Sequence, residues 1–264
     1  MSERDVYQAG VPCWVDILVD EPARAMDFYG RLFGWEFDGP GPGDYYEAHL
    51  RGRRVAGVGA APDEVPAVWN TYVSVARIED AVEAAIRAGA RVLAESVDAL
   101  PAGRAAVLED PTGAAICLWE PAQRLGCALV NEPSAYAMSL LQTREKDAAA
   151  HFYHRVFGWD TEPFGSAATL FRLPGYVGGE PAQPVPRDVV AAMAPDGDHA
   201  RWSVDFWVHD ADALADTVEE LGGRVLAPPS DAGPLRQALL EDPFGAAFSV
   251  TTAPMLRPDE GEGE

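Results

Sequence analysis

The sequence is poor in cysteine and in long apolar runs, and each shortage excludes a class of protein. Its 264 residues contain three cysteines, Cys13, Cys117 and Cys127, which are widely spaced and form no C-x-x-C pair. This scattered set predicts neither a disulfide framework nor a zinc site built on thiolates. No apolar run approaches the roughly 20 residues of a spanning helix, and the first ten residues lack the basic-then-apolar order of a signal peptide. We therefore expect a cytoplasmic protein with no membrane partner.

Positive charge is also scarce. Lys plus Arg total 20 against 42 Asp plus Glu, which gives a formal net charge of −22. A surface of this sign repels the phosphate backbone of nucleic acids and attracts cationic molecules. We therefore expect no nucleic-acid partner, and a cation is the more compatible ligand.

The short motifs of several enzyme classes are missing as well. There is no G-x-S-x-G nucleophile turn and no Gly-rich phosphate loop. None of the five histidines has a second histidine four residues away, so no helix carries a paired-histidine metal motif.

What the sequence does contain is an internal repeat. The segment Phe28 to Trp35 (FYGRLFGW) returns 124 residues later as Phe152 to Trp159 (FYHRVFGW). The segment Leu108 to Ala115 (LEDPTGAA) returns 132 residues later as Leu240 to Ala247 (LEDPFGAA). Recurrence of two separate motifs in the same order indicates a duplicated unit.

The repeat predicts two domains, 1–127 and 128–264, joined near residues 122–134. The second copy is longer because of the Gly/Pro-rich stretch from Pro174 to Gly197, whose composition predicts a loop. The last residues, 257–264 (RPDEGEGE), are acidic and lack apolar anchors. We expect this tail to be disordered.

Each domain in turn consists of two similar halves. In the first half, Val15, Ile17 and Val19 alternate with the residues between them, as in a strand, and apolar residues then follow at helical spacing. Short strands complete the unit, and the same order begins again near Trp69. The elements expected in the first domain are strands at 14–19, 45–50, 54–60, 69–75 and 91–94, helices at 22–33 and 78–88, and a hairpin around 110–113.

These motifs resemble the vicinal oxygen chelate superfamily, which includes glyoxalase I, extradiol dioxygenases and bleomycin-resistance proteins. The resemblance is carried by the helix end R-A-x-x-F-Y-x-x-x-F-G-W (Arg24 to Trp35, and in part His151 to Trp159) and by E-D-P-x-G (Glu109 to Gly113 and Glu241 to Gly245). It extends from about Pro12 to Thr251. It implies an α+β fold of tandem domains, each made of two βαβββ modules that form a curved sheet around a cleft.

Metal-dependent members of the superfamily place two histidines and a glutamate at set positions of these strands. Alignment on the motifs puts Trp14, Asn70 and Cys117 at those positions in the first domain, and Met138, Ser203 and Ser249 in the second. Neither trio resembles a two-histidine, one-carboxylate site. Glu47, with His49 beside it, is the one acidic candidate from a middle strand, and a single pair cannot hold a divalent ion tightly. We predict that no catalytic metal and no other cofactor is bound.

Strand alternation predicts which side chains face each cleft. The apolar residues of the first strand pack under the helices, so Trp14 and Asp16 face the cleft, and the same reasoning applies to the other strands. Each cleft is then expected to offer aromatic rings, an aspartate and small polar groups to a ligand. The ligand-binding residues predicted in this way are Trp14, Asp16, His49, Asn70, Tyr72, Cys117, Trp119, Met138, Ser203, Asp205, Trp207 and Ser249.

Three functions remain open from the sequence. The favoured one is metal-independent binding of a small, planar aromatic natural product, cationic or neutral, as in the antibiotic-binding branch of the superfamily. Such a protein would sequester an antibiotic, or act beside a biosynthetic enzyme in an aromatic polyketide pathway, for instance an anthracycline pathway. The second is a metal-free isomerase, lyase or oxygenase-type enzyme using Asp16, Asp205, Glu47 or His49 as acid or base. The third is an interaction module without a ligand. Monomer and homodimer are both compatible with the sequence.

Overall fold

The fold was analysed in a computed structural model, which describes residues 3–62, 65–165, 168–178, 185–195, 199–233 and 235–252. The predicted disordered tail at 257–264 lies outside the described residues. Within them, the longest helices have 12 residues, and no helix is both long and apolar enough to cross a membrane.

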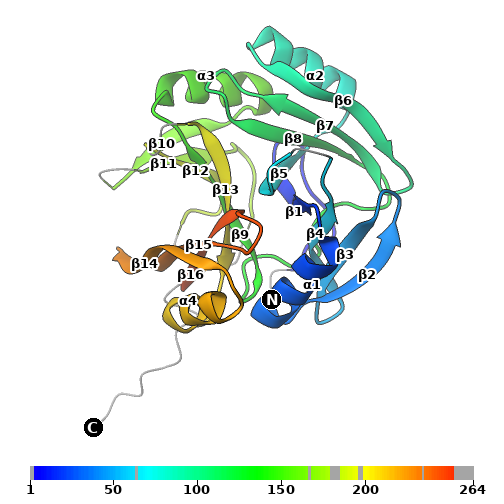
Figure 1. Cartoon of the computed structure of the whole chain (residues 1–264). Coiled ribbons are helices and arrows are strands. Elements are labelled where there is room, and N and C mark those ends of the chain that lie inside the picture. Colours follow the sequence, from blue (N-terminus) through cyan, green and yellow to red (C-terminus); the bar gives the residue numbers. More distant parts are fainter. Residues whose placement is uncertain are drawn as a thin grey trace.

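The first domain folds into one curled sheet with two helices on its outer side (Figure 1). Its strands follow the order β2-β3-β4-β1-β5-β8-β7-β6. The two βαβββ modules join where β1 pairs antiparallel with β5. The elements are β1 (Pro12–Val19), α1 (Pro22–Phe33), β2 (Glu36–Gly41), β3 (Tyr45–Leu50), β4 (Arg53–Ala60), β5 (Val68–Ser74), α2 (Ile78–Arg87), β6 (Arg91–Ala99), β7 (Gly103–Glu109) and β8 (Ala115–Pro121).

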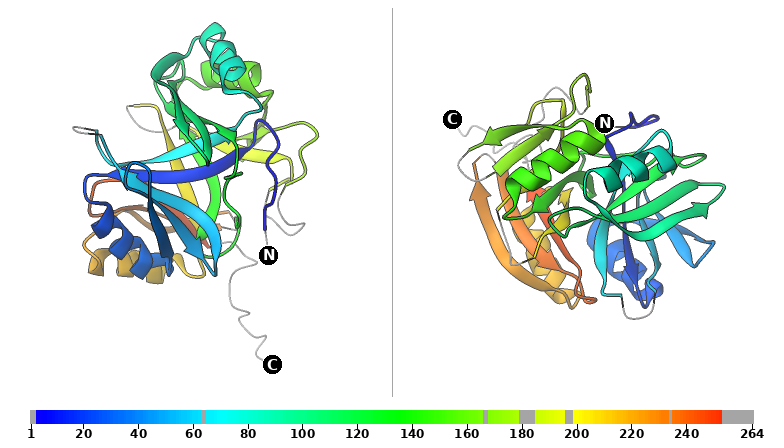
Figure 2. Two further views of the ribbon diagram at one scale, coloured as in Figure 1. Left: turned by 90° about the vertical axis from the view of Figure 1, so that its right-hand side faces the viewer. Right: turned by 90° about the horizontal axis from the view of Figure 1, so that it is seen from above.

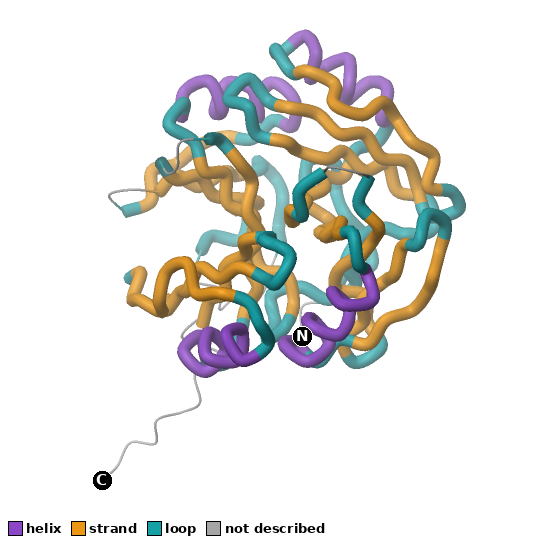
Figure 3. The backbone as a smooth tube through the Cα atoms, in the orientation of Figure 1, coloured by secondary structure: helices purple, strands orange, loops and turns teal. Residues whose placement is uncertain are grey.

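The second domain repeats this arrangement, with the strand order β10-β11-β12-β9-β13-β16-β15-β14. Figure 3 shows the strands of both sheets with the helices along their outer sides. The elements are β9 (Ala135–Gln142), α3 (Lys146–Phe157), β10 (Asp160–Phe164), β11 (Ala168–Arg172), β12 (Val189–Ala194), β13 (Arg201–Trp207), α4 (Ala211–Glu220), β14 (Arg224–Ala232), β15 (Leu235–Glu241) and β16 (Ala247–Thr252). The predicted α+β fold of tandem domains with curved sheets is confirmed.

Two details differ from the sequence prediction. The stretch 174–197 is not only a loop, because β12 lies inside it at Val189–Ala194. The edge strands β2 and β10 were not expected: β2 has the sequence EFDGPG, and all five residues of β10 are exposed. Edge strands of this kind lack the apolar alternation from which strands are predicted.

The helices start and stop as their sequences suggest. Pro22 occupies the first turn of α1, where its missing N–H costs nothing, and Gly34 ends the helix in the left-handed conformation (φ 72°). Gly158 ends α3 in the same way. The inner face of α1 buries Ala25, Phe28, Tyr29, Leu32 and Phe33, the apolar stripe expected from the repeat.

The hydrophobic cores are shared between the two domains. One core joins the first module of the first domain to the last module of the second, and the other core joins the two middle modules. Helix α2 therefore lies beside α3, and α1 lies beside α4, as the two views of Figure 2 show. The concave face of the first sheet also contributes side chains, Trp14 and Trp119, to the first of these cores.

One tyrosine of α1 and one tyrosine of α3 each form a hydrogen bond with the other domain. The Tyr29 hydroxyl of α1 donates to Asp242 Oδ2 of the second domain (2.7 Å), and the Tyr153 hydroxyl of α3 donates to Asp110 Oδ2 of the first (2.7 Å). Each hydroxyl also accepts a hydrogen bond from a tryptophan, Trp69 or Trp202. The two repeated motifs thus bind each other across the domain interface, and burial raises the pKa of both tyrosines.

Candidate functional site

Backbone register shows which residues of the two clefts are equivalent. Pairing along β1, β5 and β8 aligns Trp14, Tyr72 and Cys117, and pairing along β9, β13 and β16 aligns Met138, Asp205 and Ser249. By the same register Asp16 corresponds to Leu140, Asn70 to Ser203, Ser74 to Trp207 and Trp119 to Thr251. Below, the first cleft is the sheet face that carries Trp14, Asp16, Tyr72 and Trp119, and the second cleft is the equivalent face with Met138, Asp205 and Trp207.

The first cleft is closed by its own side chains. The Asp16 carboxylate is buried and accepts hydrogen bonds from Asn70 Nδ2 and from the hydroxyls of Tyr45 and Tyr72, each at 2.9 Å. Trp14 Nε1 donates to the Tyr45 hydroxyl (2.8 Å). Burial raises the pKa of Asp16, although the three donors oppose the shift. Both oxygens of this carboxylate thus accept hydrogen bonds within the protein.

Arg124, from the connection between β8 and β9, fills the rest of this space. Its guanidinium carbon lies 4.6–5.1 Å from the ring centres of Trp14, Tyr45 and Trp119. Its Nη1 lies 3.2 Å from Glu47 Oε1. The sequence did not single out Tyr45 or Arg124. Strand alternation with Glu47 places Tyr45 on this face, but no local pattern marks Arg124.

The second cleft contains a cavity of about 340 Å³. It is at the lower end of the range of roughly 300–1,000 Å³ for small-molecule sites. Its walls are mainly apolar and aromatic, and it is bordered by strands of the second sheet together with the segment that precedes β1. The lining residues used below are Arg4, Tyr7, Tyr136, Met138, Phe164, Ala168, Tyr176, Asp205, Trp207, Gln237, Ser249 and Thr251.

Asp205 is the acidic residue of this cavity. It is 9% exposed, and its Oδ1 accepts hydrogen bonds from Ser249 Oγ (2.7 Å) and Thr251 Oγ1 (2.8 Å). Its Oδ2 accepts none from the described residues. Burial raises its pKa to about 6, and the hydrogen bonds from the two hydroxyls partly oppose this upward shift. A carboxylate oxygen is therefore available to a ligand within an apolar cavity.

The predicted site residues separate into three groups. Met138, Asp205, Trp207 and Ser249 line the open cavity. Trp14, Asp16, Asn70, Tyr72, Cys117 and Trp119 lie together in the closed first cleft, and Ser203 is buried with its Oγ donating to the Leu140 carbonyl. His49 contacts the Glu47 carbonyl and Asp38, while Glu47 lies against Arg124 and Arg54. A ligand-binding role for these residues stays a prediction.

Several cavity residues were missed by sequence reasoning. Gln237 pairs with Thr251 across β15 and β16, so strand alternation extended to β15 would have found it. Tyr7 and Tyr176 come from segments outside regular elements, and only the tertiary structure brings them to the cavity.

The positions of the superfamily metal ligands do not fit a divalent ion. Trp14 offers only its Nε1–H, which donates to Tyr45, and Asn70 offers a single amide oxygen. Burial raises the pKa of the Cys117 thiol, which disfavours the thiolate that binds metals. In the second cleft, Ser203 and Ser249 donate to protein oxygens, and the third position is Met138. Across the described part of the chain, no group of three or more His, Cys, Asp and Glu residues is placed to hold a metal.

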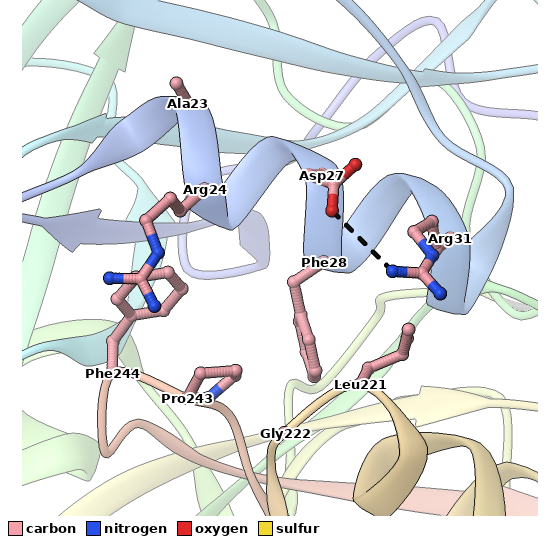
Figure 4. Close-up of a pocket in the computed structure, with 9 residues that line it drawn as sticks. All are labelled: Ala23, Arg24, Asp27, Phe28, Arg31, Leu221, Gly222, Pro243 and Phe244. Atoms are coloured by element: carbon pink, nitrogen blue, oxygen red, sulfur yellow. Dashed lines mark ion pairs between the residues drawn. The ribbon is translucent and has the colours of Figure 1, made fainter.

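A second cavity, of about 500 Å³, lies between α1 and the loops of the second domain (Figure 4). Arg31 faces Asp27 on the same helix (3.9 Å), and Arg24 lies over the Phe244 ring. The side chains of Arg31 and Asp27 are each more than 60% exposed, so water screens the attraction between their charges. None of the described residues that line this cavity is a buried polar side chain comparable to Asp205.

Comparisons with known proteins agree on the family. The model of the glyoxalase-like domain matches twice, at residues 14–119 and 138–251. A protein of Mycobacterium tuberculosis named "Putative glyoxylase CFP32" is 36% identical over 95% of this chain and 97% of its own length. The anthracycline biosynthesis protein DnrV of Streptomyces peucetius is 31% identical over 92% of this chain and 94% of its own.

Solved structures share the fold at low sequence identity. The Mn(II)-bound glyoxalase from Novosphingobium aromaticivorans superposes with a TM-score of 0.65 at 16% identity, covering 97% of this chain and 92% of that one. The 2,3-dioxygenase LapB from Pseudomonas sp. KL28 gives a TM-score of 0.64 at 14% identity, covering 94% of each chain.

Proposed function

The chain belongs to the glyoxalase-like domain family of the vicinal oxygen chelate superfamily, and from that premise we propose that it binds a planar aromatic natural product carrying an amine, without a metal ion. The ligand occupies the second cleft. The role is accessory: the protein carries or sequesters a product or intermediate of an aromatic polyketide pathway.

The observation that carries this proposal is the environment of Asp205. A carboxylate with an unused oxygen, held in an apolar cavity lined by Tyr136, Phe164, Tyr176 and Trp207, matches an aromatic ring system with a protonated amine. The rings supply flat apolar contact and cation–π attraction of about 0.5–2 kcal/mol. Charge pairing with Asp205 orients the amine, and the net charge of −22 attracts such a cation from a distance.

Two further findings support the proposal. The donor sets at the superfamily metal positions do not suit a divalent ion, so binding relies on the protein side chains themselves. The relative DnrV carries the name of an anthracycline biosynthesis protein, and it aligns over nearly the whole chain.

Titration of tryptophan fluorescence tests the proposal, with an amino-sugar anthracycline and its neutral aglycone as probes, each with and without a chelator. We expect saturable quenching that the chelator does not change, with the amino-sugar compound bound about tenfold or more tightly than the aglycone. Asp205→Asn should remove that preference, because it removes the charge and keeps the side-chain shape. Asp16→Asn is the matched control in the closed cleft and should keep the preference. Absence of saturable quenching by either probe contradicts the proposal.

A second function is favoured by one specific observation. A buried carboxylate whose pKa is raised to about 6 has the acidity of a general base or acid working near neutral pH. Asp205 could therefore move a proton on the bound molecule, as in a metal-free isomerase or lyase. Chromatography of the aromatic probe after incubation distinguishes the two functions: a product that forms with the wild type but not with Asp205→Asn indicates the enzyme, and an unchanged probe indicates the carrier.

A further inference from the structure

The first cleft already contains a cation, the guanidinium of Arg124. This residue is 7% exposed although it lies in a connection between domains, and its backbone is fixed at both ends. Its N–H donates to the Ala102 carbonyl (2.9 Å), and its carbonyl accepts from Trp119 Nε1 (2.9 Å). The guanidinium is thus held in place by the chain around it.

The surroundings of this guanidinium are those of a cation-binding site. Trp14, Tyr45 and Trp119 bring three aromatic rings within 5.1 Å of its central carbon. Aromatic faces at this distance attract a planar guanidinium by cation–π interaction and stacking. The carboxylate of Glu47 supplies the opposite charge at 3.2 Å. Asp16, hydrogen-bonded to Tyr45, is a second, buried carboxyl group that interacts electrostatically with Arg124.

At the matching positions, the second cleft lacks the three aromatic rings that surround Arg124 in the first cleft. Register along β3 and β11 places Ala168 where the first domain has Tyr45, and Met138 replaces Trp14. Thr251 stands where the first domain has Trp119. Each replacement exchanges an aromatic ring for a smaller or more flexible side chain, and all three replacing residues line the open cavity.

We propose that the first cleft is a guanidinium-binding site whose ligand is the chain's own Arg124, so that an external ligand enters the second cleft only. The first half of this inference is independent of the proposed function. The second half rests on that function and predicts one bound aromatic ligand per chain.

Replacement of the arginine by a free guanidinium tests the inference. In Arg124→Ala, we expect methylguanidinium chloride to bind saturably and to raise Tm by about 2–4 °C once its concentration exceeds Kd several-fold. Methylammonium chloride at equal ionic strength should give less than half of that shift, because it cannot stack between the rings. Arg54→Ala is the matched control: Arg54 also faces Glu47 (3.7 Å) but lies over no aromatic ring of the described residues, so its loss should create no saturable site. Equal responses of wild type and Arg124→Ala to methylguanidinium overturn the inference.

A measurement on the wild type covers the case in which Arg124→Ala does not fold. In a 15N spectrum of arginine side chains, we expect one Nε–H signal to be shifted upfield by the rings and to exchange slowly with solvent. Arg124→Lys should remove that signal alone. If every arginine Nε–H signal exchanges rapidly, the inference is wrong.

The two conclusions fail separately. Rescue by methylguanidinium without aromatic-ligand binding would retain the cation site and reject the proposed function. Aromatic-ligand binding at two sites per wild-type chain would reject the closure of the first cleft and retain the proposed function.

Discussion

Two aspartates at cleft positions have opposite surroundings. Asp16 accepts three hydrogen bonds and lies near Arg124, whereas Asp205 accepts two on one oxygen and has no cation among its hydrogen-bond partners in the described residues. Burial raises the pKa of both carboxyls, and for Asp205 the value is about 6. The same residue type thus has both carboxylate oxygens bonded by the protein in one cleft and one oxygen left without a donor from the described residues in the other.

Asp205 should lower the stability of the protein at neutral pH. Its pKa is higher in the folded chain (about 6) than the ordinary value of 3.8, so the folded state holds its proton more tightly than the unfolded state does. Protonation of Asp205 therefore stabilises the folded state. The stabilisation is complete below about pH 4 and is lost as the pH rises through 6. We expect Asp205→Asn to be more stable than wild type by about 1–3 kcal/mol at pH 8 and nearly equal to it at pH 4.

Urea unfolding at pH 4, 6 and 8 measures this difference, with free ligand absent. Asp205→Asn is compared with wild type at the same pH, so that the contributions of all other titrating groups cancel. A stability difference between Asp205→Asn and wild type that does not change with pH would contradict the prediction.

The elements of the two domains correspond strand by strand, and the differences lie in what their inner faces carry. Gly57 of β4 is placed opposite Glu47 and beside Asp16, and a Cβ at this position would overlap the Tyr45 hydroxyl. The equivalent residue of β12 is Ala192, where the ring is absent because Ala168 replaces Tyr45. Glycine on β4 is therefore required by the closed cleft and not by the strand itself.

A double-mutant cycle tests this dependence. Gly57→Ala should destabilise the wild type by about 1–3 kcal/mol, because the new methyl group displaces the Tyr45 ring. In a Tyr45→Ala background the same substitution should cost close to nothing, as at Ala192. Urea unfolding of the four proteins gives the coupling energy. If Gly57→Ala costs the same in both backgrounds, the ring is not the cause.

Sequence reasoning predicted some elements and contacts better than others, for physical reasons. Helix α1 was predicted at its observed bounds because its apolar stripe, Pro22 and Gly34 all agree. The inner face of β13 followed from the alternation of Val204 and Phe206 with Asp205. The role of Arg124 could not be predicted, since it depends on the path of a connection across a neighbouring sheet. The hydrogen bond between Tyr29 and Asp242 joins residues 213 positions apart, a separation at which local patterns carry no information.

The whole molecule is held together by two cores that each contain residues of both domains. Neither domain therefore has a complete core of its own, although each has a complete sheet. The segment before β1 takes part in this exchange, because Trp159 Nε1 of the second domain donates to the Gly10 carbonyl (2.7 Å). The cavity of the second cleft is lined by residues from both ends of the described chain, among them Arg4 and Thr251.

The buried tyrosines should contribute measurably and separately to global stability. Tyr29→Phe and Tyr153→Phe each remove a hydrogen bond to a buried carboxylate, and we expect each to cost about 1–3 kcal/mol. The two changes lie in different cores, so their costs should add in the double variant. Tyr46→Phe is the control, because no hydrogen bond joins the Tyr46 hydroxyl to the described residues. Thermal unfolding of wild type and the four variants measures these costs, and a cost for Tyr46→Phe as large as for the other two would contradict the assignment.

An isolated half of the chain should not behave as a folded monomer. A fragment of residues 1–127 leaves the apolar faces of α1 and α2 without their partners from the second domain. We expect this fragment to self-associate or to remain unfolded, and to give the native circular dichroism spectrum only when mixed with the fragment 128–264. Light scattering and circular dichroism measure both properties. A monodisperse, folded monomer of 1–127 would show that each half has a sufficient core.

The crossing of Tyr29 to Asp242 and of Tyr153 to Asp110 also decides how the two copies can diverge. A substitution of the first copy's tyrosine removes the hydrogen bond to the second copy's aspartate. The compensating substitution must therefore occur in the other copy. Among descendants of this duplicated gene, residues 29 and 242 should therefore covary as one pair, and residues 153 and 110 as another. No such hydrogen-bonded pair joins the described residues of one cleft face to those of the other, which leaves one cleft free to close on an arginine while the other stays open.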